Sequence, residues 1–308
     1  MESCYTFHLA IDFWERMLLS LASNRQLKRK NPTLKQSPAE GRSTVEEHLS
    51  HLVQSCKEHG NPIAPTAPLV ALSCRNVLAN LRCGAWIKGR TTGFLTVIEE
   101  ESARARRPYH ALGLKNGRLV IEEFIPRPDT LNSFEWLVTG VPVWWDGEPV
   151  FQRILTEAAD PSHVFHLPRG HHPLATKETI SRWQRLHRRF LDLVNSPLDE
   201  AFREMRKSAL GLKRENNYLH NVVGVTADGR LRVLVGNGRL ERLGKRIAEC
   251  GVKRAIVVDN GGSTSVFYFP RGFRHRAIQL VAAPNYRPMG TALLIVVRPD
   301  QVSRSNLE

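Results

Sequence analysis

The sequence predicts an α+β protein built on a mixed, mostly antiparallel sheet with flanking helices. Short apolar runs punctuated by turn residues predict strands from about residue 69 onward. Turns of two or three residues join several of these runs, which is typical of antiparallel hairpins. Helical spacing of apolar residues is found near the N-terminus, after Thr176 and after Leu240.

Residues 1–68 are expected to form a helical arm that ends in a proline-rich linker. Apolar residues near the N-terminus recur at helical spacing: Trp14, Met17, Leu18 and Leu21. A second helix is predicted to begin at Ser43–Thr44, because Glu46 and Glu47 would then lie in its first turn, where the helix dipole favours acids. Gly60-Asn61-Pro62 should end this helix, and the prolines of residues 62–68 separate the arm from a main domain at 69–300.

The first half of the main domain is expected to contain several strands. They are Ala85–Ile87, Thr92–Ile98, Leu119–Phe124, Phe134–Val138 and Val141–Trp145. Asn116-Gly117 precedes the third of these strands, and this dipeptide predicts a hairpin because both residues tolerate positive φ. Asp146-Gly147 predicts another turn directly after Trp145.

The C-terminal third has the most regular pattern. The predicted strands are Asn221–Val225, Leu231–Val235, Ala255–Val258, Ser263–Phe269 and Ala292–Val297. Ala227-Asp228-Gly229 predicts a tight turn between the first two of them. A helix at Leu240–Cys250, ended by Gly251, would connect the second strand to the third, and such a crossover suits a parallel pair.

Residues 152–214 are interpreted as an insertion, and residues 301–308 as a tail. The insertion is polar and histidine-rich at first, and an apolar stripe then predicts a helix at Thr176–Asn195. Its histidines lie among prolines and glycines, which predicts a solvated loop rather than a zinc site with defined geometry: His163, His166, His171 and His172.

The composition excludes several classes of protein. Five scattered cysteines without a C-x-x-C pair indicate neither a zinc ribbon nor a disulfide framework. No run approaches the ~18 consecutive apolar residues that a membrane-spanning helix needs, and acids interrupt the apolar N-terminal stretch where an export signal would lie. We therefore expect a cytoplasmic protein without a membrane span.

The charge balance predicts a polyanionic partner or substrate. Lys and Arg number 44 against 30 Asp and Glu, which gives a formal net charge of +14. Bases also outnumber acids on the predicted helix of the insertion, which carries Arg182, Arg185, Arg188 and Arg189. Two interpretations of these arginines stay open, a solvated helix face and a surface that binds nucleic acid.

Residues 257–265 form the densest group that could carry chemistry. Asp259 follows a predicted buried strand, and two glycines and three hydroxyl residues come after it. Glycines let a backbone approach a ligand and present its N–H groups to an anion. The alternative is a well-formed turn whose Asp and Asn satisfy local backbone groups.

This segment, IVVDNGGSTSVFYF, resembles the signature of the phosphodiester glycosidase domain, which is an apolar strand, an Asp-Gly-Gly-Gly-Ser-like turn and another strand. NVVGVTADGRLRVLV and LGKRIAECGVKRAIVVD resemble the hairpin and helix that precede the signature in this family. NYRPMGTALLIVV resembles its closing segment, and WLVTGVPVWWDGEPV its Gly-Pro strand and Asp-Gly turn. The resemblance covers residues 85–150 loosely and 218–297 more firmly.

The resemblance implies the family's fold and hydrolysis of the bond between a sugar's anomeric carbon and a phosphate. It implies that Asp259 is the motif carboxylate, acting as an acid/base or by electrostatic stabilisation, and that Arg287 clamps the phosphate. The substrate-binding candidates are Asn260, Gly261, Gly262, Ser263 and Thr264, with His220, Asn221 and Asn285 in second rank. Asn260 stands where the family has a glycine, and His220-Asn221 where it usually has Arg-Thr.

We therefore predict a hydrolase that cleaves a glycosyl phosphodiester in a phosphorylated sugar or an anionic polymer. The alternative is a non-catalytic module on the same fold that binds nucleic acid or another polyanion through its basic helices. No cofactor is predicted, and a divalent metal is left open.

Overall fold

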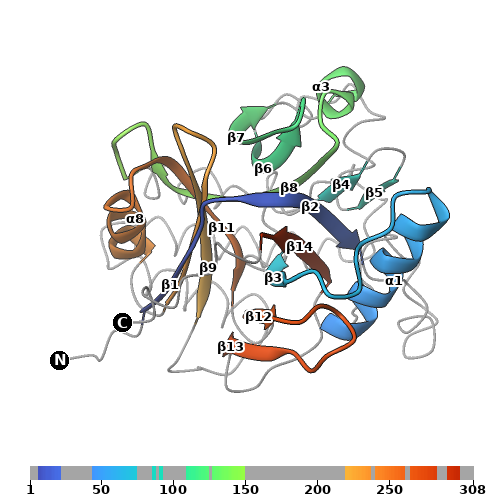
Figure 1. Ribbon diagram of the computed structural model, residues 1–308. Coiled ribbons are helices and arrows are strands. Elements are labelled where there is room, and N and C mark those ends of the chain that lie inside the picture. Colours follow the sequence, from blue (N-terminus) through green and yellow to red (C-terminus); the bar gives the residue numbers. More distant parts are fainter. Residues whose placement is uncertain are drawn as a thin grey trace, which may run out of the picture.

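A computed structural model places the strands of the 308-residue chain in two sheets (Figure 1). The structure describes residues 6–21, 44–74, 85–87, 90–92, 109–124, 127–149, 219–236, 240–260, 264–282 and 290–298. All pairings between the named strands are antiparallel.

Within the described residues, the larger sheet has nine strands in the order β1-β10-β9-β11-β8-β4-β5, with β6 paired to β8 and to β7. Their bounds are β1 Thr6–Ile11, β4 Ala85–Ile87, β5 Arg90–Thr92, β6 Tyr109–Lys115, β7 Arg118–Phe124, β8 Trp136–Trp145, β9 His220–Thr226, β10 Leu231–Gly236 and β11 Val252–Asn260. The described part of the smaller sheet has five strands in the order β13-β12-β3-β14-β2. Their bounds are β2 Trp14–Leu21, β3 Leu69–Cys74, β12 Ser265–Phe269, β13 Ile278–Ala282 and β14 Thr291–Val297.

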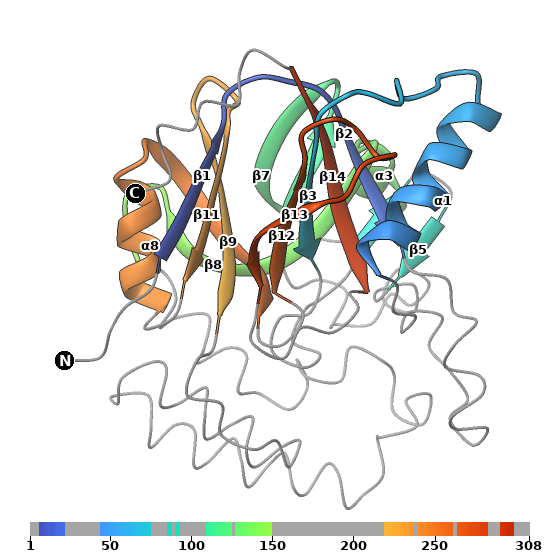
Figure 2. The same cartoon turned by 60° about the horizontal axis from the view of Figure 1, so that its bottom comes forward.

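The main core contains buried side chains of both sheets, because alternate residues of each strand point to the same face. Val223 and Ile256 of the larger sheet belong to this core, as do Leu72 and Leu293 of the smaller one. Helix α1 (Val45–Glu58) packs on the other face of the smaller sheet, and α8 (Leu240–Ala248) packs against β8, β9 and β11. Figure 2 shows these two helices at opposite sides of the molecule.

The protein is mostly β, so the predicted α+β class is wrong. Within the described residues there are only three helices, α1, α8 and the short α3 (Pro128–Asn132), and they do not form a helical layer. The strands dominate because segments far apart in the sequence pair with one another. For example, β3 lies between β12 and β14, and neither β3 nor β13 was predicted as a strand.

The predicted N-terminal helix is also wrong, because residues 6–21 form β1 and β2. β1 pairs with β10 in the larger sheet, and β2 pairs with β14 in the smaller one. Met17 and Leu19 of β2 face the main core, whereas Leu18 packs with α1 on the opposite face. A strand that is buried on both faces carries apolar residues at consecutive positions instead of alternate ones. Its sequence can therefore also match the spacing of apolar residues in a helix.

The predicted local signals are confirmed in the described segments. Asn116 and Gly117 have φ of 51° and 70° in the turn between β6 and β7, and Gly147 and Gly229 also adopt positive φ in their turns. Thr44 caps α1 in a capping box: its N–H donates to Glu47 Oε2 over 2.8 Å, and its hydroxyl accepts from the Glu47 N–H over 3.2 Å. The predicted strands at 134–138 and 141–145 fall in one strand, β8, which begins at Trp136, two residues later than predicted.

The two strands joined by the predicted crossover helix, β10 and β11, run in the same direction as expected, but they are not paired with each other. The helix after β10 does lead to β11, but β9 lies between these two strands and pairs antiparallel with both. The sequence shows the crossover helix but not the strand that is inserted between its two ends.

Several predictions lie outside the described residues. They include most of the strand at 92–98, the insertion at 152–214 with its four histidines and its arginines Arg182, Arg185, Arg188 and Arg189, and the tail at 301–308. Among the described residues, no helix combines the length and the apolar character that crossing a membrane requires.

Candidate functional site

Asp259 lies near the end of β11, opposite Asn221 of β9. The pairing register shifts between Val257 and Asp259, which marks a β-bulge. Bulges interrupt the alternation of side chains and can redirect one of them. Val258 belongs to the main core, and Asp259, one residue further, lies opposite Asn221, which is two residues from the core residue Val223 and so faces the same side as it. The bulge therefore allows both consecutive side chains to face the space between the sheets.

The smaller sheet brings further polar side chains to the same end of the core. Thr291 begins β14 and lies opposite Cys74, the last residue of β3. Leu72 and Leu293 face the main core, so Cys74 and Thr291, each two positions away, face it as well. Thr264 directly precedes β12 and is fully buried, as are Cys74, Thr291, Asn221 and Asp259.

Hydrogen bonds connect the two sheets at this end. Asn221 Nδ2 of the larger sheet donates to the Ser73 carbonyl of the smaller sheet over 2.8 Å. The Ser73 hydroxyl accepts a hydrogen bond from the backbone N–H of Ser265 at 2.9 Å. The Thr264 hydroxyl donates to the Leu219 carbonyl, just before β9, over 3.3 Å. The bonds of Asn221 and Thr264 tie the start of β9 to the smaller sheet, and Asn221 lies opposite Asp259.

Cys74 is a protonated thiol in this environment. Burial raises the pKa of the Cys74 thiol far above its ordinary value, and the nearby carboxylate of Asp259 raises it further. A thiol of this kind is a weak nucleophile, because the thiolate is the reactive form. The group that can exchange protons at neutral pH is therefore not Cys74.

Two buried polar atoms of this group, Asn221 Oδ1 and Thr291 Oγ1, have no hydrogen-bond partner within the described part of the chain. Leaving a buried polar atom unsatisfied costs about 1–3 kcal/mol. Such an atom in a native protein calls for an explanation, and contact with a polar group of a ligand is one. This pair of atoms, beside the carboxylate of Asp259, marks the candidate site.

The predicted site residues divide into three groups. Asp259 and Asn221 are brought together at the end of the core, and Thr264 bonds to Leu219, two residues before Asn221. His220 precedes Asn221 in β9 and therefore points to the opposite face of the strand, where it is buried. The other predicted site residues lie outside the described residues: Gly261, Gly262, Ser263, Asn285 and Arg287. For Asn260 the structure describes the backbone but not the side chain.

Sequence reasoning missed Cys74 and the backbone carbonyl of Ser73 as parts of the site; the Ser73 side chain itself alternates to the opposite face of the smaller sheet, with Leu69 and Ala71. Their signal was the apolar run Leu69–Cys74, whose last two residues can bind a polar group at a strand end. The run was not assigned as a strand, because its partners β12 and β14 lie far along the chain. For example, Ser73 and Ser265 are hydrogen-bonded although 192 residues separate them. The described residues contain no group of three or more His, Cys, Asp or Glu that could hold a metal ion.

Comparisons with known proteins give only distant likenesses. No protein-family model matches the chain, and no match is found among curated proteins. The catalytic domain of zebrafish N-acetylglucosamine-1-phosphodiester alpha-N-acetylglucosaminidase, auto-inhibited by its pro-peptide, is similar with a TM-score of 0.47 and 12% identity, over 97% of this chain and 85% of that one. A hypothetical protein from Synechocystis is similar with a TM-score of 0.37 and 11% identity, over 95% of this chain and 59% of that one. With TM-scores below 0.5, these likenesses carry no conclusion about fold, reaction or substrate.

Proposed function

We propose that this protein is a hydrolase that cleaves the bond between the anomeric carbon of a sugar and a phosphate in a glycosyl phosphodiester. The observation that carries the proposal is the position of Asp259. Its carboxylate belongs to the segment that resembles the phosphodiester glycosidase signature, and a bulge lets it face the same buried space as Asn221 and Thr291.

In the proposed reaction, Asp259 accepts a proton from water as the water oxygen bonds to the anomeric carbon. The bond from that carbon to the phosphate oxygen breaks, and its electron pair leaves with the phosphate monoester. The proton then passes from Asp259 to solvent, so the products are a free sugar and a phosphate monoester. While the anomeric carbon carries positive charge, the same carboxylate stabilises it.

The other site residues have binding roles in this proposal. Asn221 Oδ1 can accept a hydrogen bond from a sugar hydroxyl, and the Thr291 hydroxyl can donate or accept one. Arg287 lies four residues before Thr291 in the sequence, and we assign its guanidinium to the departing phosphate.

The proposal is tested by hydrolysis of a panel of UDP-sugars and sugar-1-phosphate diesters. Asp259→Asn keeps the shape of the side chain but cannot accept the proton, so kcat/KM should fall by about 10²–10⁴-fold. In Arg287→Ala, kcat/KM should fall as well, because the leaving phosphate loses the positive charge of the guanidinium. Asp228→Asn, in the exposed turn between β9 and β10, is the matched control and should keep wild-type turnover.

Circular dichroism and the thermal midpoint must first show that each variant is folded. Wild-type turnover in folded Asp259→Asn would contradict the assigned role. If the wild-type protein turned over no member of the panel, the non-catalytic polyanion-binding alternative would be favoured. Steeply salt-dependent binding of an oligonucleotide that survives Asp259→Asn would then be expected.

A further inference from the structure

The loop between β12 and β13, residues 270–277, carries a cluster of exposed basic side chains. Four of its eight residues are basic and exposed: Arg271, Arg274, His275 and Arg276. The three arginines form no ion pair with other residues that the structure describes. The loop lies on the side of the smaller sheet that carries α1 (Figures 1 and 2). These side chains are therefore available to an anionic partner.

Packing against the rest of the protein holds the backbone of this loop in place. Phe273 is half-buried and packs in the apolar cluster between α1 and the smaller sheet. Gly272 is buried with a φ of 80°, and a Cβ atom built there would lie 1.9 Å from the Pro65 carbonyl oxygen. Hydrogen bonds of 3.3 Å close two turns, from the Gly272 N–H to the Phe269 carbonyl and from the His275 N–H to the Gly272 carbonyl. The backbone is thus pre-organised, which reduces the entropy lost when the loop binds a partner.

Acids are scarce around the loop. Residues 59–74, 264–282 and 290–298 contain no Asp or Glu, and strand pairing brings the start of β3 and the end of β14 beside the end of β12. Arg298, exposed directly after β14, adds a further positive charge to this end of the smaller sheet. At the neighbouring ends of β2 and α1, each acid is adjacent to a base in the sequence: Glu15 to Arg16, and Glu58 to Lys57. The surroundings therefore do not cancel the positive charge of the loop.

The chemistry of this surface favours the phosphate backbone of a nucleic acid. An arginine guanidinium pairs with a phosphate through two parallel hydrogen bonds. A nucleic-acid strand carries a phosphate on every nucleotide, so one strand can contact several of these arginines, and the formal net charge of +14 attracts it over a longer range. A basic cluster in a protein with a sequence pI of about 10.0 is the electrostatic signature of such binding. Phe273 packs inward, so the loop offers no aromatic ring to a base or to a bilayer.

We propose that the β12–β13 loop binds the phosphate backbone of nucleic acid through its three arginines, without reading the bases. The loop lies at the opposite end of the smaller sheet from the candidate catalytic site. Phe269, just before the loop, pairs with Leu69 at the start of β3, whereas Cys74 of the candidate site ends that strand. The two ends of β3 are about 17 Å apart, at a rise of about 3.3 Å per residue. The proposal therefore does not depend on the proposed hydrolase activity, and it uses other residues than the arginines of the insertion.

The test is fluorescence anisotropy with the full chain and a fluorescein-labelled oligo-thymidine of about 20 nucleotides. We expect saturable binding with a Kd below about 10⁻⁴ M at about 150 mM salt. Arg271→Ala/Arg274→Ala/Arg276→Ala should weaken binding at least about tenfold. The slope of log Kobs against log salt should become shallower by about 2 in this variant, because each phosphate contact of a single strand contributes about 0.7. A mixed-sequence oligonucleotide should bind within about threefold of oligo-thymidine, because phosphate contacts carry no sequence information.

Two further variants control for net charge and for the fold of the loop. Arg242→Ala/Lys245→Ala/Arg246→Ala removes three exposed bases of α8, on the opposite side of the molecule from α1 (Figure 2), and should weaken binding less than about threefold. Replacing the three loop arginines by lysine keeps their charge and should keep the Kd within about fivefold of wild type. Circular dichroism must match that of the wild type in every variant.

Three results would overturn the proposal. They are equal losses in the two alanine variants, an unchanged salt slope in the loop variant, and no saturable binding with about 100 μM protein at about 50 mM salt. Tighter binding of polyglutamate, or of vesicles that contain phosphatidylserine, would also overturn it. These last outcomes would assign the loop to an acidic protein or to a membrane surface.

Discussion

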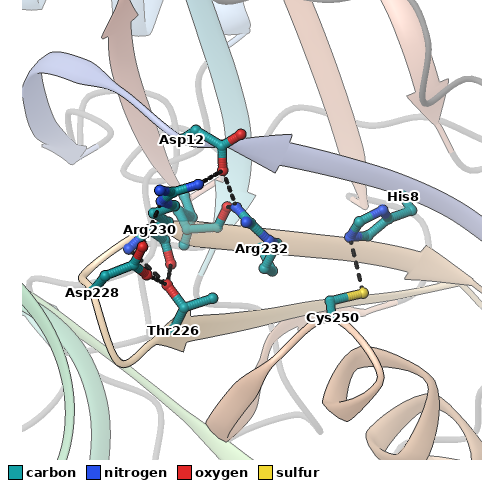
Figure 3. A network of polar contacts seen from close by, with 8 residues as sticks. His8, Asp12, Thr226, Asp228, Arg230, Arg232 and Cys250 are labelled. Atoms are coloured by element: carbon teal, nitrogen blue, oxygen red, sulfur yellow. Dashed lines mark hydrogen bonds and ion pairs between the residues drawn. The ribbon is translucent and has the colours of Figure 1, made fainter.

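His8 and Cys250 are separated by 242 residues, yet His8 Nε2 and Cys250 Sγ lie 3.2 Å apart (Figure 3). Burial lowers the pKa of His8, and the charge of Arg232 lowers it further. Burial raises the pKa of the Cys250 thiol, although Arg232 opposes that rise. Both groups are therefore neutral at pH 7, and their contact is a thiol–imidazole hydrogen bond rather than an ion pair.

The lowered pKa of His8 predicts a loss of stability in acid. The unfolded chain binds this proton near pH 6.5 and the folded chain only at lower pH, so the unfolded state holds more protons as the pH falls below 6.5. The free energy of unfolding should therefore decrease from pH 7.5 to 5.5, with a contribution from His8 of at most about 1.4 kcal/mol per pH unit. In His8→Gln this decrease should be shallower.

Urea unfolding at several pH values measures this difference. Between pH 8 and 9 the imidazole is neutral in both states, so the gap between wild type and His8→Gln should be constant there. Parallel curves for the two proteins down to pH 5.5 would show that His8 does not contribute.

At the scale of elements, α8 lies so close to β8 that it requires a glycine at the contact. A Cβ atom built on Gly244 would lie 2.7 Å from the Val143 carbonyl oxygen. Alanine is more favourable than glycine in a helix by about 1 kcal/mol, so helix propensity alone would favour alanine here. Packing against β8 outweighs that propensity, because the neighbouring atom belongs to the backbone of a central strand and cannot move aside easily.

We therefore expect Gly244→Ala to lower the free energy of unfolding by about 1–3 kcal/mol, despite its better helix propensity. Arg246→Ala, at an exposed position of the same helix, is the matched control and should change stability by less than about 0.5 kcal/mol. Chemical denaturation of the two variants measures both effects. Stabilisation by Gly244→Ala would mean that α8 can move away from β8 without cost.

At the scale of the whole molecule, residues 6–21 join the two sheets. They contribute β1 to the edge of the larger sheet and β2 to the edge of the smaller one. Trp136 of β8 also donates from Nε1 to the Met17 carbonyl over 2.9 Å, which connects the larger sheet to β2. The N-terminal segment is therefore a structural part of the β fold rather than a separate arm.

Deletion of residues 1–21 should consequently abolish folding. Met17 and Leu19 are buried, and each contributes about 1.5–3 kcal/mol by burial, against a typical total stability of about 5–15 kcal/mol. Two strands and their hydrogen bonds would be lost as well. The measurement is soluble yield together with NMR peak dispersion, and deletion of residues 301–308, the predicted tail, is the control. A well-dispersed spectrum from the shortened chain would contradict the integral role of β1 and β2.

The candidate site was predictable in part. Asp259 and its neighbours could be found because an apolar run, a carboxylate and two glycines are adjacent in the sequence. Cys74 and Ser73 could not be placed beside them, because their proximity to Asn221 and Asp259 depends on contacts between the two sheets. His220 was expected near Asp259, but its position next to Asn221 in the same strand directs it to the opposite face.

The sequence by itself determined the features that depend on neighbouring residues. Asn116-Gly117 and Gly229 specified their turns through the positive φ that these residues tolerate, and Thr44 with Glu47 specified the start of α1 through reciprocal hydrogen bonds. Only the tertiary structure decided that residues 6–21 are strands, that β9 separates β10 from β11, and that the polar ends of β3, β9, β11 and β14 meet. The physical reason is that strands gain most of their stability from pairing and burial against partners distant in the chain, and a local pattern does not contain those partners.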